Sequence, residues 1–161
     1  MTNIPSSMPT IYAGWQNYQG LLIAALAPLT PEQLTLSAAP GLRSIGGLAR
    51  HMIGARARWF YMDMGEGGAE FAALGEWDRP GQPARAAIEL VGGLETTWRS
   101  MQAAIIRWTP EDWAQTFPNE LPTDPRYTRH WIIWHLIEHD LHHGGEISLT
   151  LGMHGLKAPD L

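Results

Sequence analysis

Histidines are unevenly distributed along this chain, and four of them lie between positions 135 and 143, in the stretch WHLIEHDLHHGGEIS. Each residue of an α-helix advances about 100°, so residues four apart lie on one face, one turn apart. The imidazoles of His139 and His143 can therefore reach one metal ion at the bond lengths of about 2.0–2.1 Å that zinc and imidazole adopt. His135 and His139 have the same spacing, so this stretch alone leaves the pair undecided.

A third imidazole is available from His51, the only histidine outside the region that follows position 129. It lies at the edge of an apolar stripe that follows the helical period and also includes Arg56. Helix bundles commonly build metal sites from side chains on facing helices. Three imidazoles and an open position are typical of a catalytic metal site rather than a closed structural one. A hydrogen-bonded core histidine and a functionless exposed pair are the alternative interpretations.

The remaining histidines, His130, His142 and His154, are interpreted as surface residues or as groups outside the ligand shell. The stretch from His135 to His139 also matches the H-x-x-E-H pattern of inverted zinc peptidases. Those enzymes need a further acidic ligand well downstream, and Glu146 is the only later glutamate. The pattern therefore does not favour a peptidase.

Apolar residues at three- and four-residue steps predict the elements that must position these side chains. Long helices are expected over about 10–27, 44–64, 84–108 and 127–151, with short helical turns near 30–36 and 109–113. Segments rich in glycine or proline predict loops over 65–83 and 119–125, and no alternating pattern is long enough for a strand. We therefore expect one all-α domain over residues 1–161, a four-helix bundle with long loops between helices 2 and 3 and between helices 3 and 4.

Composition disfavours several classes of function. The formal net charge is −5, and the 11 lysines and arginines are scattered, which is not typical of a nucleic-acid binder. No stretch approaches the roughly 20 apolar residues that span a bilayer, and the N-terminal stretch lacks the pattern of a signal peptide. The absence of cysteine excludes a thiol nucleophile from the chain itself and is compatible with a cytoplasmic location.

Several motifs resemble those of the DinB/YfiT-like metal-binding four-helix bundles. They are Leu-Thr-Pro-Glu-Gln-Leu at 29–34, Pro-Gly at 40–41, Ser-Ile-Gly at 44–46 and Leu48-x-x-His51. The most specific is Glu-His-Asp-x-His-His-Gly-Gly-Glu at 138–146, which is similar to the family segment E-H-x-x-H-H-R-G-Q/E. The resemblance covers nearly the whole chain and places the metal ligands on His51, His139 and His143. It differs at Gly144, where the family often has arginine.

The resemblance implies one divalent metal ion, most often zinc or nickel. It also implies an enzyme, often dimeric, of the kind that transfers a small-molecule thiol such as bacillithiol, mycothiol or glutathione to an electrophile, or a related hydrolase. A non-enzymatic bundle that binds a metal or a small ligand is the alternative. Tryptophans such as Trp15, Trp59 and Trp134 are candidates for the wall of the cavity, although simple core packing is the favoured interpretation of each. We further expect carboxylates to orient the imidazoles. The candidate carboxylates are Glu138, Asp140 and Glu146.

Overall fold

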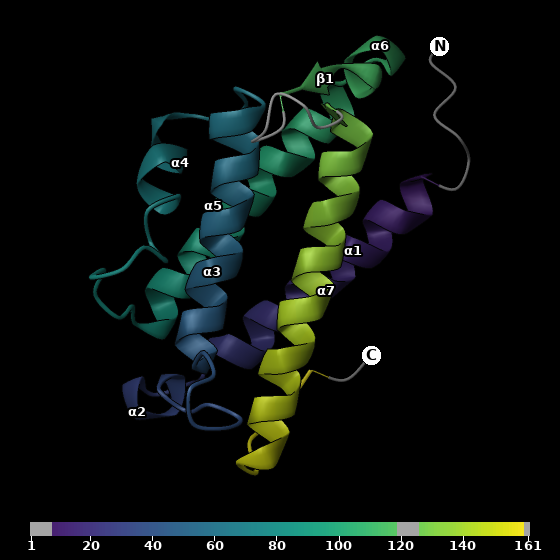
Figure 1. Cartoon of the computed structure of the whole chain (residues 1–161). Helices are drawn as coiled ribbons and strands as arrows, with labels where there is room; N and C mark the ends of the chain where they lie inside the picture. Colours follow the sequence, from purple (N-terminus) through teal and green to yellow (C-terminus); the bar gives the residue numbers. More distant parts are fainter. Residues whose placement is uncertain (1–7, 119–125, 160–161) are drawn as a thin grey trace.

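The four long helices of this chain form a bundle, as expected from the apolar periodicity (Figure 1). A computed structural model describes residues 8–118 and 126–159. The long helices are α1 (Met8–Leu26), α3 (Ile45–Ala57), α5 (Ala87–Arg107) and α7 (Arg129–Met153). Helix α3 packs against both α5 and α7, and α1 packs against α5. The two helices that carry the histidine motifs are therefore neighbours.

Short polar side chains fix where several helices begin. The Ser44 hydroxyl accepts a hydrogen bond from the Gly47 amide at the start of α3. The Thr128 hydroxyl accepts one from the Trp131 amide at the start of α7. Thr30 forms a capping box with Gln33 around α2 (Pro31–Leu34), and Thr109 caps α6 (Pro110–Ala114). Each cap satisfies an amide that has no partner within its helix.

Two expectations were wrong: that the segment 65–83 forms only a loop, and that the sequence contains no strand. The segment 65–83 contains a short helix, α4 (Ala69–Leu74), because Phe71 and Leu74 are buried one turn apart beside α3. Two-residue strands, β1 (Thr116–Phe117) and β2 (Tyr127–Thr128), pair antiparallel where no strand was expected. This pairing shifts the start of the last helix from the predicted position 127 to 129. The loop predicted over 119–125 lies outside the described residues.

The helix predicted over 44–64 is an α-helix in its first part and a π-helix in its second. Helix α3 continues as a π-helical stretch, η1 (Arg58–Asp63). Such wide turns are rare and often lie at functional sites. The stretch buries Phe60 against Phe71 and Trp108, while Trp59 contacts the aromatic side chains at the start of α7.

No helix among the described residues is both long and apolar enough to cross a bilayer.

Candidate metal centre

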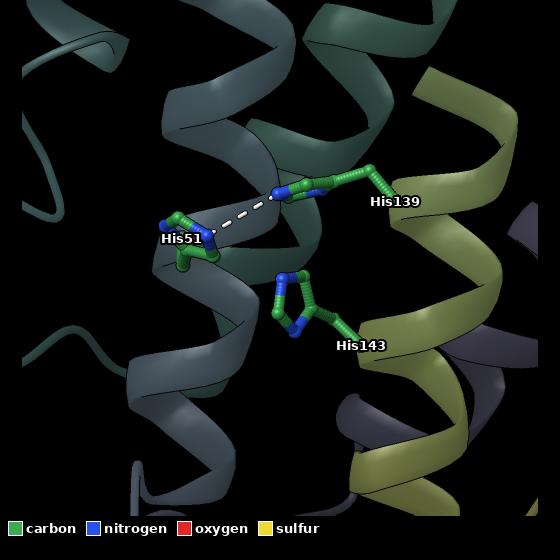
Figure 2. A group of neighbouring side chains, drawn as sticks. All are labelled: His51, His139 and His143. Atoms are coloured by element: carbon green, nitrogen blue, oxygen red, sulfur yellow. Dashed lines mark hydrogen bonds between the residues drawn. The ribbon is translucent and has the colours of Figure 1, made fainter. Parts of the chain in front are cut away.

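The structure brings His51 together with His139 and His143 between α3 and α7, although 88 positions separate the first two along the chain (Figure 2). The Nε2 atoms of His51 and His139 lie 3.2 Å apart. One ring nitrogen from each of the three histidines lies within 4.8 Å of the others. The three imidazoles point toward one another, so these nitrogens surround one position.

A carboxylate holds the outer nitrogen of His51. Its Nδ1 lies 2.7 Å from Asp78 Oδ2, and Arg58 donates to both oxygens of Asp78 over 2.6 and 3.0 Å. Burial alone would raise the pKa of Asp78, but hydrogen bonds and positive charge from Arg58 and His51 outweigh it and lower this pKa to about 2. The ionised carboxylate can only accept, so Nδ1 of His51 donates to it, and Nε2 of the same ring is directed toward His139.

His143 is held in a similar way. Its Nδ1 lies 2.6 Å from Oε2 of Glu146, one turn further along α7. Glu146 is one of the three carboxylates expected to orient an imidazole. The other two do different things: Glu138 is exposed and lies 3.8 Å from His135, and Asp140 is buried against Arg56.

Burial keeps the imidazoles of His139 and His143 uncharged. Desolvation, followed by the charges of His143 and His51, lowers the pKa of His139 to about 3. Burial also lowers the pKa of His143, against the opposing effect of its hydrogen bond to Glu146. The Nδ1 atom of His139 is buried, and no described residue forms a hydrogen bond with it. Neutral imidazole is the form that binds a metal ion.

A divalent ion fits this group of nitrogens. Tetrahedral bonds of about 2.0–2.1 Å place two ligand nitrogens roughly 3.4 Å apart, and the observed separation of the His51 and His139 Nε2 atoms is 3.2 Å. Carboxylates that hold the outer nitrogens of two imidazoles are typical partners of metal-bound histidines. Three ligands also leave at least one coordination position open.

The other histidines lie outside this group. The ring of His135 stacks on Trp131, with centroids 5.1 Å apart and planes within 9°, and its centroid lies 5.9 Å from that of His139. His130 and His154 are exposed, as expected, and the side chain of His142 is 66% exposed. The geometry therefore groups His143, and not His135, with His139 and His51.

The tryptophans expected around a cavity have different environments. Trp15 is buried and donates to Asp140 over 2.7 Å, so it belongs to the core. Trp59 packs against His135 and Trp131, one turn of α7 away from the histidine group. Trp134 is 57% exposed, which contradicts a role in the wall of a cavity within one chain. Of the three, only Trp59 is near the site.

Asp78 was missed by the sequence analysis because it lies in a segment that predicted only a loop. One signal in the sequence was Gly54, a glycine inside a helix. A Cβ atom at Gly54 would lie 2.7 Å from Asp78 Oδ1 and 2.9 Å from an Arg58 nitrogen. A glycine is needed there because the carboxylate that supports His51 lies directly against the helix backbone.

Replacing Asp78 with asparagine should weaken binding of zinc by about 10- to 100-fold, the range typical of lost partners of metal-bound histidines. The amide cannot match a carboxylate as the acceptor for His51 Nδ1. Competition with a chromogenic chelator measures the change. Glu76→Gln is the matched control, because this exposed carboxylate of the same segment pairs with Arg79, at 4.0 Å. Equal affinities for the two variants would contradict the assignment of Asp78.

Gly144, the position at which the motif departs from the family segment that it resembles, lies against Tyr18. A Cβ atom at Gly144 would clash with the Tyr18 hydroxyl oxygen and lie within 2.9 Å of its ring. The ring of Tyr18 fills the space into which a side chain would extend. An arginine at this position would therefore require Tyr18 to move.

Gly144→Ala should destabilise the protein by about 1–3 kcal/mol, the usual cost of adding a group to a filled core. The neighbouring Gly145 provides the control, because a Cβ atom there would meet nothing within 4 Å. Gly145→Ala should instead stabilise the helix by up to about 1 kcal/mol. Urea denaturation measures both, and a loss of stability in both variants would show that the contact with Tyr18 is not the cause.

Acid should destabilise the metal-free protein, because His139 resists protonation only while folded. Its pKa is about 3 in the fold and about 6.5 in an unfolded chain. Between these values the unfolded state binds more protons, so the free energy of unfolding falls as the pH drops, by up to about 1.4 kcal/mol per pH unit. Urea titrations at about pH 7.5 and pH 5 measure this slope. His139→Gln should reduce it, and the exposed His130→Gln should not.

A four-helix bundle with three histidines converging from two facing helices is the architecture of a bundle-type metal site. The family model of the DinB superfamily matches residues 15–147, and the chain belongs to this superfamily. A crystal structure of a DinB-like protein from Bacillus cereus ATCC 10987 is similar over 96% of this chain and 97% of its own, with a TM-score of 0.74 and 21% identity. At that identity the likeness concerns the fold. A search of curated proteins found no match.

Proposed function

We propose that this protein is a divalent-metal-dependent enzyme that transfers a small-molecule thiol to an electrophile, with His51, His139 and His143 as the metal ligands. The observation that carries the proposal is the convergence of ring nitrogens from three histidines, two of them held by carboxylates. Three ligands leave a position open for a substrate, whereas a structural site is closed by four.

A divalent ion held by three imidazoles is a Lewis acid, which lowers the pKa of a water or a thiol that reaches it. Zinc and nickel are both compatible with three imidazoles. The chain's own contribution is to keep the imidazoles of His139 and His143 neutral through burial and to fix the orientation of the group. Asp78 and Glu146 perform the second task through the outer nitrogens of His51 and His143.

The thiol has to come from a cosubstrate, because the chain contains no cysteine. Cosubstrates of the bacillithiol, mycothiol or glutathione class provide such a group. In the transfer, the sulfur forms a bond to an electrophilic carbon, the leaving group departs with the bonding electron pair, and the thiol proton passes to solvent. The ring of Trp59 packs against His135, one turn of α7 before His139, and we propose it as the aromatic side chain beside the electrophile.

The test is turnover of 1-chloro-2,4-dinitrobenzene with a panel of the three thiols, by zinc- or nickel-loaded protein. Formation of the thioether changes the absorbance and releases chloride. We expect turnover with at least one thiol that is abolished by chelation and by His139→Ala. Metal that is held tightly without turnover across the panel would favour the alternative, a non-enzymatic bundle that binds a metal or a small ligand.

A further inference from the structure

A charged pair lies at the centre of the bundle, between the two helices that carry the histidines. Arg56 of α3 and Asp140 of α7 are both fully buried. Nε of Arg56 donates to both oxygens of Asp140 over 3.1 Å, and one terminal nitrogen donates to Oδ2 over 2.6 Å. The remaining partners come from the other two long helices: Trp15 and Gln19 of α1, and Thr97 and the Leu94 carbonyl of α5.

The pair lies next to the histidine group along both helices. Asp140 directly follows His139 and precedes His143 by three positions, and Arg56 follows His51 by five. The pair therefore joins α3 to α7 within about one and a half helical turns of the histidines on each helix. Any sliding or rotation of α3 against α7 would break the hydrogen bonds of the pair and separate the histidine nitrogens together.

Stability alone does not account for such a pair. Replacing a buried ion pair by apolar side chains of similar volume is often neutral or stabilising, because the charges no longer have to be removed from water. Directional hydrogen bonds, in contrast, are satisfied in one arrangement of the helices, whereas apolar contacts are satisfied in several. A metal site needs that single arrangement, since ligand atoms must be held within about 0.5 Å.

We infer that Arg56 and Asp140 are positioning residues that fix α3 against α7 so that His51 meets His139 and His143. The inference rests on the proposed function, because the alignment of the three histidines serves metal binding. The alignment itself can be measured without a metal. The two residues contact no ligand position themselves and act through the helices that they join.

Arg56→Lys is the first test, because lysine keeps the charge opposite Asp140 but cannot reproduce the planar fork of donors. The matched control is Arg129→Lys. Arg129 is also buried and paired, with Glu66, but it lies ten residues before His139, about 15 Å along α7. A second test variant, Arg56→Met with Asp140→Leu, removes both charges and leaves no unpaired ion in the core.

The readouts are the affinity for cobalt(II) by chelator competition, the cobalt ligand-field spectrum, and, without metal, NOEs between the imidazoles of His51, His139 and His143. Both test variants should bind cobalt at least about tenfold more weakly, with an altered spectrum and weaker NOEs, while still unfolding cooperatively. Arg129→Lys should keep wild-type affinity within about twofold, whatever stability it loses.

Wild-type affinity, spectrum and NOEs in the two folded test variants would overturn the inference. The proposed function fails separately, if the wild-type protein binds no metal. In that case the NOEs still decide whether the pair aligns the histidines, because they are measured on metal-free protein.

Discussion

Replacing His139 with alanine should remove nearly all tightly bound metal from the protein. The three imidazoles are nearly equidistant, with ring centroids 4.9 Å apart for His51 and His139, 4.4 Å for His139 and His143, and 4.8 Å for His51 and His143. Loss of one of three ligands should lower the affinity for zinc by more than the roughly 100-fold upper range for lost outer partners. Elemental analysis after dialysis and chelator competition measure the effect.

Two neighbouring histidines provide the controls. His142→Ala changes an exposed imidazole beside His143, and His135→Ala removes the ring at the alternative spacing, which stacks on Trp131. Both variants should retain their zinc, and His51→Ala and His143→Ala should lose it as His139→Ala does. Loss of zinc in His135→Ala with retention in His143→Ala would reverse the choice of ligands, and retention in all five variants would contradict a histidine site.

The long helices could be predicted because their apolar residues follow the helical period and short polar caps mark where they begin. The elements that were missed depend on contacts between distant segments. Helix α4 is held by two buried side chains, Phe71 and Leu74, in a segment whose glycines indicate a loop. The π-helical stretch after α3 continues the same apolar pattern, so nothing in the periodicity distinguishes it from an α-helix.

In the site, too, the features that follow from local sequence could be predicted, and those that depend on contacts between distant segments could not. The spacing of His139 and His143 on one helix is a local property, so both were candidates from the sequence, and the resemblance selected them over His135. Asp78 contacts His51 from 27 positions away, through a segment whose path depends on the fold. Its role therefore could not be predicted from spacing.

The role expected of Asp140 was wrong, and the sequence contained a reason to expect another. Its place beside His139 favoured a role in orienting an imidazole, whereas its partner is Arg56. The sequence did contain a signal, because an arginine within an apolar stripe has to be paired when it is buried. An acidic residue one position after His139, on a helix that faces the same core, was the available partner.

Asp140→Ala should lower the free energy of unfolding by about 3–5 kcal/mol, the usual result of leaving one charge of a buried pair without its partner. Arg56 would stay fully buried with only Gln19, Thr97 and the Leu94 carbonyl as partners, and Trp15 would lose its acceptor. Small domains have only about 5–15 kcal/mol of stability in total, so this is the largest loss of stability that we expect from a single substitution.

Urea denaturation should be carried out on metal-free protein, because a metal that binds only the folded state adds its own binding energy to the measured stability. Glu138→Ala, an exposed carboxylate two positions earlier, should change stability by less than about 0.5 kcal/mol. Adding Arg56→Met to Asp140→Ala should restore part of the loss, because the uncompensated charge is then removed. A loss below about 1 kcal/mol in Asp140→Ala, or no recovery in the double variant, would mean that the Arg56 charge is stabilised without Asp140. The alignment of α3 and α7 would then have to depend on the apolar contacts between them.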